Sequence, residues 1–454
     1  MSGLAKILTL RGAEVSGSDS RESATVAALR AMGARVAVGH AAEHLPAGAS
    51  CAVVSSAIRP DNPELVAARE RGLPVVHRAD ALAALMDGRR AIAVAGTHGK
   101  TTTTSMLAVA LGSLGLDPSY AIGGDLDEPG SNAHHGSGPI FVAEADESDR
   151  SFHKYAPEVA IVLNVELDHH ANYASIEEIH QSFETFVGRI TPGGTLVVSA
   201  DHPGARELTA RVRDRADLRI VTVGESPDAS LRILSVRPRG MSSEVTVALS
   251  SQDGAARDTL TFTVSVPGRH YAHNAVSALA AGAALGVPAA ELATALGTYT
   301  GVRRRLQLKG AAAGVQVIDS YAHHPTEIAA DLDAIRENAA GGRVLVVFQP
   351  HLFSRTQQLG TEMGQALAAA DAALVLDIYP AREDPIPGVT SDVIIEAARG
   401  HGGDATAVAA MSEVPDAIAA LARDGDLVLT MGAGDVTALG PEILARLSGV
   451  EASA

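Results

Sequence analysis

Short apolar runs alternate with alanine-rich stretches along most of the chain. Runs such as residues 52–56, 91–95 and 159–164 are bounded by polar or glycine-containing segments, and the stretches between them have the composition of helices. This alternation is typical of parallel sheets whose strands are connected by crossover helices. The pattern therefore predicts an α/β fold with Rossmann-like, doubly wound sheets.

Two interruptions of this pattern divide the chain. Residues 86–90 (MDGRR) break the alternation, and a second break lies near residue 300, just before three consecutive arginines at 303–305. Between the two breaks, residues 244–247 and 259–264 alternate polar with apolar side chains, which indicates half-exposed antiparallel strands added to the central sheet. We therefore predict three domains, over residues 1–88, 89–300 and 301–454.

The longest uncharged run, residues 271–290, has the length of a membrane span but not its composition. It contains His273, Asn274, two glycines and Pro288, and it is rich in alanine rather than leucine. Membrane-spanning helices are dominated by larger apolar side chains. We interpret the run as one buried helix and expect no membrane insertion.

The charge balance limits the possible partners. The 454 residues include 36 Lys and Arg against 53 Asp and Glu, a net charge of −17. Such a surface repels nucleic acid, and an anionic ligand needs a local cluster of cations. The single cysteine, Cys51, excludes an intrachain disulfide, and the first residues lack the apolar stretch of a signal peptide. We expect a cytoplasmic protein that binds no nucleic acid and is a monomer or a weak dimer.

A glycine-containing turn follows the strand at 91–95 and opens a predicted helix at about 102–114. In such a turn, backbone N–H groups wrap phosphates, Lys100 reaches the β/γ-phosphates and the Thr101 hydroxyl meets magnesium. Val94 stands where the strict pattern has its first glycine, so the loop is a shortened variant. Simple helix capping is the alternative, but a lysine beside the positive helix end is unfavourable without an anion. The predicted phosphate-binding residues are Gly96, Thr97, His98, Gly99, Lys100, Thr101 and Thr102.

Acidic and histidine side chains follow two further predicted strands. Glu144 comes directly after the strand at 139–143, and carboxylates at such a position beside a phosphate loop commonly hold magnesium. Asp168 and His169 follow the strand at 159–164, where a second metal or phosphate contact is predicted. An acidic run is often only a solvated turn and a histidine often an ordinary surface residue, so these interpretations remain open.

The third domain has two polar segments that each follow a predicted strand. They cover residues 319–327 and 351–356, and both are expected at the sheet edge where open α/β sheets bind ligands. With the arginines at 303–305, they supply the local positive charge that a polyanionic substrate requires. Helix caps and surface arginines are the alternative interpretation.

Taken together, these segments resemble the Mur ligase family, the ATP-dependent amino-acid ligases of peptidoglycan precursor synthesis. The resemblance spans nearly the whole chain, and its motifs occur in the family's order. They are residues 95–106 (AGTHGKTTTTSM), 144–148, 268–274, 304–305, 323–327 and 348–351. The resemblance implies a Rossmann-like N-terminal domain for a UDP-sugar, a central P-loop ATPase domain and a Rossmann-like C-terminal domain for an amino acid. The family's first strand and glycine-rich turn have no counterpart before Met1, and we expect that the start was placed at an internal methionine.

The resemblance is greatest to the alanine-adding branch. It implies that ATP drives the attachment of L-alanine to the carboxylate of UDP-N-acetylmuramate through an acyl phosphate, with release of ADP and phosphate. No lysine occurs between Lys154 and Lys309, so the carbamylated lysine of sibling ligases has no candidate there. A ligase that adds a tripeptide to the same sugar, and a P-loop ATPase that switches conformation, remain the alternatives.

The resemblance also implies roles for individual residues. Those implied to bind ATP or magnesium are Lys100, Thr101, Glu144, His169, Asn274, Arg305 and Asp319, with Thr101, Glu144 and His169 as the Mg²⁺ ligands. Lys100, His323 and Arg355 are the expected catalytic residues, the latter two on the muramoyl and alanine side. Ser320, Ala322 and Leu352 depart from the family's usual residues, and Leu352 puts one substrate contact in doubt.

Overall fold

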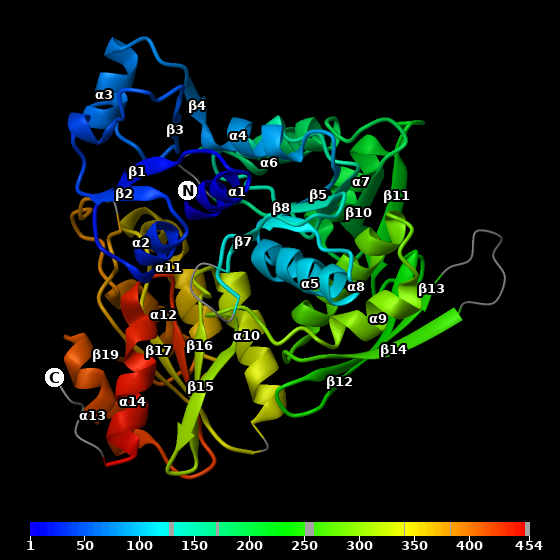
Figure 1. Cartoon of the computed structure of the whole chain (residues 1–454). Helices are drawn as coiled ribbons and strands as arrows, with labels where there is room; N and C mark the ends of the chain where they lie inside the picture. Colours follow the sequence, from blue (N-terminus) through cyan, green and yellow to red (C-terminus); the bar gives the residue numbers. More distant parts are fainter. Residues whose placement is uncertain (127–130, 169–171, 250–257, 340, 382, 450–454) are drawn as a thin grey trace. The chain divides into compact units, whose positions relative to one another are not determined.

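The computed structural model describes residues 1–126, 131–168, 172–249, 258–339, 341–381 and 383–449 (Figure 1). The chain folds into two compact units. Unit 1 comprises Met1–Ser235, Val245–Thr263 and His273–Tyr299, and unit 2 comprises Val236–Glu244, Val264–Ala272 and Thr300–Ala454. Residues 1–88 therefore belong to the same unit as most of the predicted central domain.

The first 88 residues alternate strands and helices, as their pattern predicts. The elements are α1 (Ser2–Leu10), β1 (Ser16–Asp19), α2 (Ala24–Ala31), β2 (Arg35–Val38), η1 (Ala42–His44), β3 (Ala52–Val54), α3 (Pro63–Glu70), β4 (Val75–His77) and α4 (Arg78–Met86). The strands form two separate parallel pairs, β1 with β2 and β3 with β4. Side-chain oxygens of Ser23 and Asn62 cap α2 and α3, which fixes where these helices begin.

Strand β5 lies in the interior of a large sheet in unit 1. The strands are β5 (Arg90–Ala95), β6 (Ser119–Ala121), β7 (Ala133–His134), β8 (Ile140–Glu144), β9 (Val159–Val162), β10 (Thr195–Ser199), β11 (Arg219–Gly224), β12 (Leu231–Pro238), β13 (Ser243–Leu249) and β14 (Asp258–Val264). Their order is β14-β13-β12-β11-β10-β9-β5-β8-β6-β7. Both neighbours of β5 run parallel to it, so β8, β5 and β9 present their carboxyl ends at one edge.

Helices cover both faces of this sheet (Figure 1). They are α5 (Lys100–Ser113), η2 (Ser151–Lys154), α6 (Ile176–Val187), α7 (Pro203–Val212), α8 (Arg269–Ala284) and α9 (Ala289–Leu296). Alternate β5 residues, Ala91, Ala93 and Ala95, join a core with Phe183 and Phe186 of α6. Helix α5 packs against β5 and β8 from the opposite face, and it begins two residues before the predicted helix.

The uncharged run 271–290 is not one helix, contrary to our prediction. Helix α8 ends at Ala284 and α9 begins at Ala289. Gly286 has a φ of +86°, and Pro288 has no backbone N–H, so the helix cannot continue through this turn. Among the described residues, none of the helices is both long enough and apolar enough to span a membrane.

Unit 2 contains a six-stranded sheet with the order β15-β16-β20-β17-β18-β19. The strands are β15 (Gln307–Ala312), β16 (Val315–Ser320), β17 (Val344–Phe348), β18 (Ala372–Val375), β19 (Ala405–Ala407) and β20 (Leu427–Met431). The helices are α10 (Pro325–Asn338), α11 (Phe353–Leu367), α12 (Asp392–Gly400), η3 (Met411–Glu413), α13 (Val414–Leu421), η4 (Asp435–Ala438) and α14 (Leu439–Leu447). Only β15 is antiparallel to its neighbour among the pairings of this sheet. The carboxyl ends of β16, β20 and β17 therefore meet at one edge, as predicted.

Candidate functional site

The glycine loop joins β5 to α5 at the carboxyl edge of the unit 1 sheet. Gly96 and Gly99 have φ angles of +136° and +85°, which side chains with a Cβ rarely adopt. A Cβ at Gly99 would also lie 2.8 Å from the Oδ1 atom of Asn274 in α8. The structure therefore brings Asn274, a predicted nucleotide-binding residue, against the predicted phosphate loop.

Hydrogen bonds fix the backbone of this loop to the segment after β9. The N–H of His98 donates to Asn164 Oδ1 at 2.8 Å, and Asn164 Nδ2 donates to the His98 carbonyl at 3.1 Å. The N–H of Glu166 donates to Thr97 Oγ1 at 2.9 Å. Such fixed backbone groups can receive a phosphate without further reorganisation.

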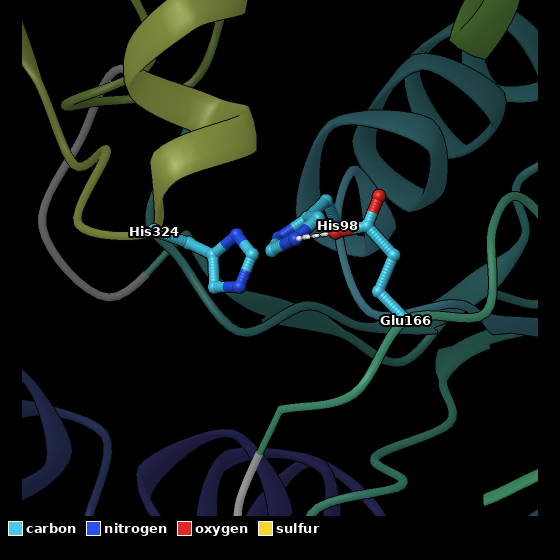
Figure 2. A group of neighbouring side chains, drawn as sticks. All are labelled: His98, Glu166 and His324. Carbon is cyan, nitrogen blue, oxygen red and sulfur yellow. Dashed lines mark ion pairs between the residues drawn. The ribbon is translucent and has the colours of Figure 1, made fainter. Parts of the chain in front are cut away.

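Glu166 also lies between two imidazoles. Its Oε2 atom is 3.4 Å from His98 Nε2, an ion pair drawn in Figure 2, and its Oε1 accepts a hydrogen bond of 3.0 Å from His202 Nε2. The third residue labelled in Figure 2, His324, belongs to unit 2, where its side chain caps the start of α10. His169, the predicted metal ligand nearby in sequence, lies outside the described residues.

Lys100 begins α5 and is surrounded by oxygen atoms. Its Nζ lies 2.6 Å from the Gly96 carbonyl, 3.2 Å from the Thr97 carbonyl, and 2.7 and 2.9 Å from the two carboxylate oxygens of Glu147. Burial opposes the charge of Lys100, but the nearby carboxylates, Glu147 foremost, outweigh it and raise the pKa above its ordinary value. Sequence reasoning missed Glu147, which it saw only as part of an acidic run.

The acidic run 144–149 points its carboxylates at several different partners. Glu144, at the end of β8, accepts a hydrogen bond of 2.7 Å from the Gly123 N–H through Oε1. Asp146 pairs with Arg78 at 2.9 Å, and Asp149 accepts a hydrogen bond from Ser56. The run is therefore an ordered loop rather than a solvated turn.

In unit 2, a buried carboxylate lies near the end of β16, and two arginines precede β15. Asp319 is fully buried and accepts hydrogen bonds from Thr430 Oγ1 at 2.8 Å and Thr437 Oγ1 at 2.5 Å. The guanidinium carbons of Arg304 and Arg305 lie 4.8 and 5.0 Å from the centre of one ring, that of Tyr321. Cations at such distances are attracted by the face of the ring.

Each arginine also has a carboxylate partner. Arg304 Nε is 3.7 Å from Asp319 Oδ2, and Arg305 Nη1 is 3.7 Å from Glu327 Oε1. Burial lowers the pKa of Arg304, and Asp319 only partly offsets it. For Arg305 burial acts in the same direction, but Glu327 and its neighbours outweigh it and the pKa is raised. Sequence reasoning did not assign Tyr321 or Glu327 a role.

The two polar segments predicted in the third domain do meet. His323 Nδ1 donates to the Tyr321 carbonyl at 2.8 Å, and its ring centre is 6.0 Å from that of His351. Arg355 Nη1 in turn lies 3.3 Å from His351 Nδ1. Leu352 has a φ of +74°, a strained angle for a leucine, so the turn between His351 and Arg355 is held in an unusual conformation.

Comparisons with known proteins show that models of one protein family match three consecutive segments of the chain. The description "Mur ligase family, catalytic domain" matches residues 1–90, "Mur ligase middle domain" matches residues 94–282, and "Mur ligase, glutamate ligase domain" matches residues 304–434. The UDP-N-acetylmuramate–L-alanine ligase of Streptomyces coelicolor is 74% identical over 448 residues, covering 99% of this chain and 95% of that protein.

Solved structures agree in fold. The UDP-N-acetylmuramate-alanine ligase of Thermotoga maritima matches with a TM-score of 0.82 at 28% identity, covering 99% of this chain and 96% of the other. A murein peptide ligase of Psychrobacter arcticus matches with a TM-score of 0.71 at 24% identity, covering 100% of this chain and 97% of the other. The second likeness concerns the fold alone. The three-domain α/β architecture predicted from the sequence is thereby confirmed.

Proposed function

The chain belongs to the Mur ligase family, and we propose that it uses ATP to join L-alanine to the carboxylate of UDP-N-acetylmuramate. The observation that carries this assignment is the 74% identity, over 99% of this chain, to the UDP-N-acetylmuramate–L-alanine ligase of Streptomyces coelicolor. The structure supports it with an ordered glycine loop whose lysine, Lys100, stands at the carboxyl edge of the sheet. The alternatives that add a tripeptide or only hydrolyse ATP are not favoured.

The chemistry requires an activated carboxylate. A carboxylate does not react with an amine at neutral pH, so the γ-phosphoryl group of ATP is transferred to the muramoyl carboxylate, which gives an acyl phosphate and ADP. The neutral amine of alanine then attacks the carbonyl carbon, the C–O bond to phosphate breaks, and inorganic phosphate leaves. Negative charge develops on phosphoryl oxygens and on the tetrahedral carbonyl oxygen, so cations positioned there lower the barrier.

The loop residues 96–102 bind the phosphates in this proposal. Gly96 and Gly99 allow the backbone to turn its N–H groups toward an anion at the start of α5, where the helix dipole also favours negative charge. Lys100, whose ammonium group is charged at neutral pH like that of any ordinary lysine, stabilises the β- and γ-phosphates. Asn274 lies against Gly99, and its contact with the adenine stays part of the proposal.

The residues at this edge fit a magnesium ion. Thr101 supplies a hydroxyl and Glu144 a carboxylate, which are the hard oxygen ligands that Mg²⁺ prefers. The hydrogen bond from Gly123 to one oxygen of Glu144 orients this carboxylate at the end of β8. We propose that Thr101, Glu144 and His169 hold the ion, which when bound neutralises charge on the transferring phosphoryl group.

Unit 2 carries the groups proposed for the amino acid. Arg355, nearly buried and oriented by His351, is suited to pair with the carboxylate of alanine, and His323 is the predicted partner on the muramoyl side. The nucleotide contacts of Arg305 and Asp319 remain predictions. We further propose that residues 1–88 receive the UDP-sugar, 89–300 ATP and 301–454 alanine, and that the reaction takes place in the cytoplasm, where ATP is supplied.

A coupled assay of ADP release tests this function. The purified chain is incubated with MgATP and with UDP-N-acetylmuramate, L-alanine, both or neither, and we expect ADP release only with both. Glycine, L-serine and the cell-wall tripeptide replace alanine as comparators. ADP release without either substrate would instead indicate an ATPase, and release with the tripeptide but not with alanine would indicate the tripeptide-adding ligase.

A further inference from the structure

The hydrogen-bonding capacity of Lys100 is fully used within the chain itself. An ammonium group has three N–H donors, and four oxygen atoms lie within 3.2 Å of Lys100 Nζ: two backbone carbonyls of its own loop and both carboxylate oxygens of Glu147. A phosphate that is to accept a hydrogen bond from Lys100 must therefore replace at least one of these oxygens.

Glu147 is the partner that a phosphate replaces most readily. The carbonyls of Gly96 and Thr97 belong to a loop whose backbone is fixed by Asn164 and Glu166. The Glu147 carboxylate, in contrast, ends a side chain with rotatable bonds. It also carries the same sign of charge as a phosphate, so the two repel each other when both are close to Lys100.

The backbone of Glu147 is held in place while its side chain makes this contact. The Glu147 carbonyl accepts hydrogen bonds from the Tyr173 hydroxyl at 2.6 Å and from the Arg150 N–H at 3.0 Å. The Tyr173 hydroxyl also lies 3.0 Å from Ser182 Oγ of α6. These hydrogen bonds fix the main chain of Glu147, which is only 2% exposed, so the carboxylate is the part of the residue that can move away from Lys100.

We propose that Glu147 is a positioning residue for the ligase reaction, an internal anion that holds Lys100 in the resting enzyme and is displaced by the β/γ-phosphates of the incoming nucleotide. The inference rests on the proposed function, because it assumes that ATP binds at the glycine loop. In this proposal, the pair between Glu147 and Lys100 stabilises the empty site. It therefore weakens the affinity for nucleotides whose β- or γ-phosphate contacts Lys100.

Isothermal titration calorimetry with Mg²⁺ and the ATP analogue AMP-PNP tests this directly. Glu147→Gln keeps the shape of the side chain and removes its charge, and we expect the affinity for AMP-PNP to rise about tenfold, since the phosphates then displace a neutral amide instead of an ion-pair partner. AMP lacks the β- and γ-phosphates, so its affinity should not change. Unchanged or weaker binding of AMP-PNP by Glu147→Gln would overturn the proposal.

Glu158→Gln is the matched control. Glu158 precedes β9 at the amino end of the strand, pairs with Arg90 at 2.5 Å, and loses the same charge on substitution. We expect wild-type affinity for both nucleotides. A tightening equal to that of Glu147→Gln would reflect the overall charge and would contradict the inference.

Steady-state kinetics add a second readout. If Glu147 only competes with the nucleotide, Glu147→Gln lowers KM for ATP and leaves kcat within about threefold of the wild type. The reason is that the Lys100–Glu147 pair is already broken in the ATP complex and stays broken in the transition state. A large loss of kcat would assign Glu147 to the chemical step instead. If Glu147→Gln does not fold, Glu147→Asp replaces it; its shorter side chain should give a smaller tightening for AMP-PNP, and no tightening would overturn the proposal.

The two proposals fail in different ways. Wild-type protein that binds AMP-PNP but releases no ADP with UDP-N-acetylmuramate and L-alanine would contradict the proposed function, while the comparison of Glu147 variants could still be made. An active ligase whose Glu147→Gln variant binds AMP-PNP no more tightly would contradict the inference only.

Discussion

The two units hold their site cations by different forces. In unit 1, Lys100 is enclosed by four oxygen atoms at 2.6 to 3.2 Å, two of them from the buried Glu147. In unit 2, Arg304 and Arg305 share the ring of Tyr321, and their carboxylate partners are 3.7 Å away, beyond hydrogen-bonding distance. Lys100 is thus held by a carboxylate pair that must break before the lysine binds an anion. The arginines are oriented by a ring and, in the case of Arg304, by a hydrogen bond from Nη2 to the Gly432 carbonyl at 2.5 Å.

Removing the cation of unit 1 is expected to have the largest effect. Lys100→Met keeps the length of the side chain but not the charge, and we expect ligation to fall by at least about 1000-fold because charge on the transferring phosphoryl group is no longer stabilised. The variant should also lose about 3 kcal/mol of stability, since the buried carboxylate of Glu147 loses its ion pair with Lys100. ADP release and differential scanning calorimetry measure the two effects.

A double variant separates these effects. Lys100→Met combined with Glu147→Gln removes both charges, so the melting temperature should recover while activity does not. If stability stayed as low as in Lys100→Met alone, the loss would come from packing of the methionine and not from the buried charge of Glu147.

Removing the ring of Tyr321 in unit 2 is expected to have a smaller effect. Tyr321→Leu removes the surface on which both guanidinium groups rest, and we expect a loss of about 1 to 2 kcal/mol in stability and about tenfold in the ligation rate, as two cation–π contacts disappear. Tyr321→Phe keeps the ring and should behave like the wild type. Equal losses in both variants would show that the hydroxyl, not the ring, orients the arginines.

The elements that carry the site cations were predictable from the sequence, but the side chains that contact these cations were not. The predictions of a strand before Gly96, a helix after it, and a carboxylate directly after a strand at 139–143 agree with β5, α5 and β8, whose last residue is Glu144. The apolar runs identify parallel strands, and the carboxyl ends of such strands meet at one edge. Local sequence therefore located the sheet edges at which the candidate residues stand.

Contacts between side chains depend on details that periodicity does not encode. Glu147 follows β8, and only the sheet order, with β8 beside β5, brings the loop after β8 next to Lys100. Arg304 has a φ of +64°, which changes the direction of the chain between two adjacent arginines and lets both face Tyr321. The helix break at Gly286 was missed because alanine-rich composition outweighed a glycine and a proline.

Histidines of unit 1 that are at least partly buried provide the last and smallest of these expected effects. Three histidines of unit 1, His135, His153 and His180, have a pKa that is shifted downward. For His153, burial is the main cause: its ring stacks on Phe152, and Nε2 hydrogen-bonds the carbonyl and the hydroxyl of Ser182, both at 2.9 Å. The folded chain therefore favours the neutral imidazole more than the unfolded chain does.

The direction of the pH dependence follows from this difference. Below the ordinary histidine pKa of 6.5, the unfolded chain binds a proton at His153 before the folded chain does, so stability falls as the pH drops from 6.5 toward the lowered value. His153→Gln, which retains a donor for Ser182 but does not titrate, should reduce the loss of melting temperature between pH 7 and pH 5 by roughly 2 °C. His401→Gln, at an exposed histidine of unit 2, serves as the control and should leave the slope unchanged. An identical slope in wild type and His153→Gln would mean that carboxylates, not this half-buried imidazole, set the acid sensitivity of unit 1.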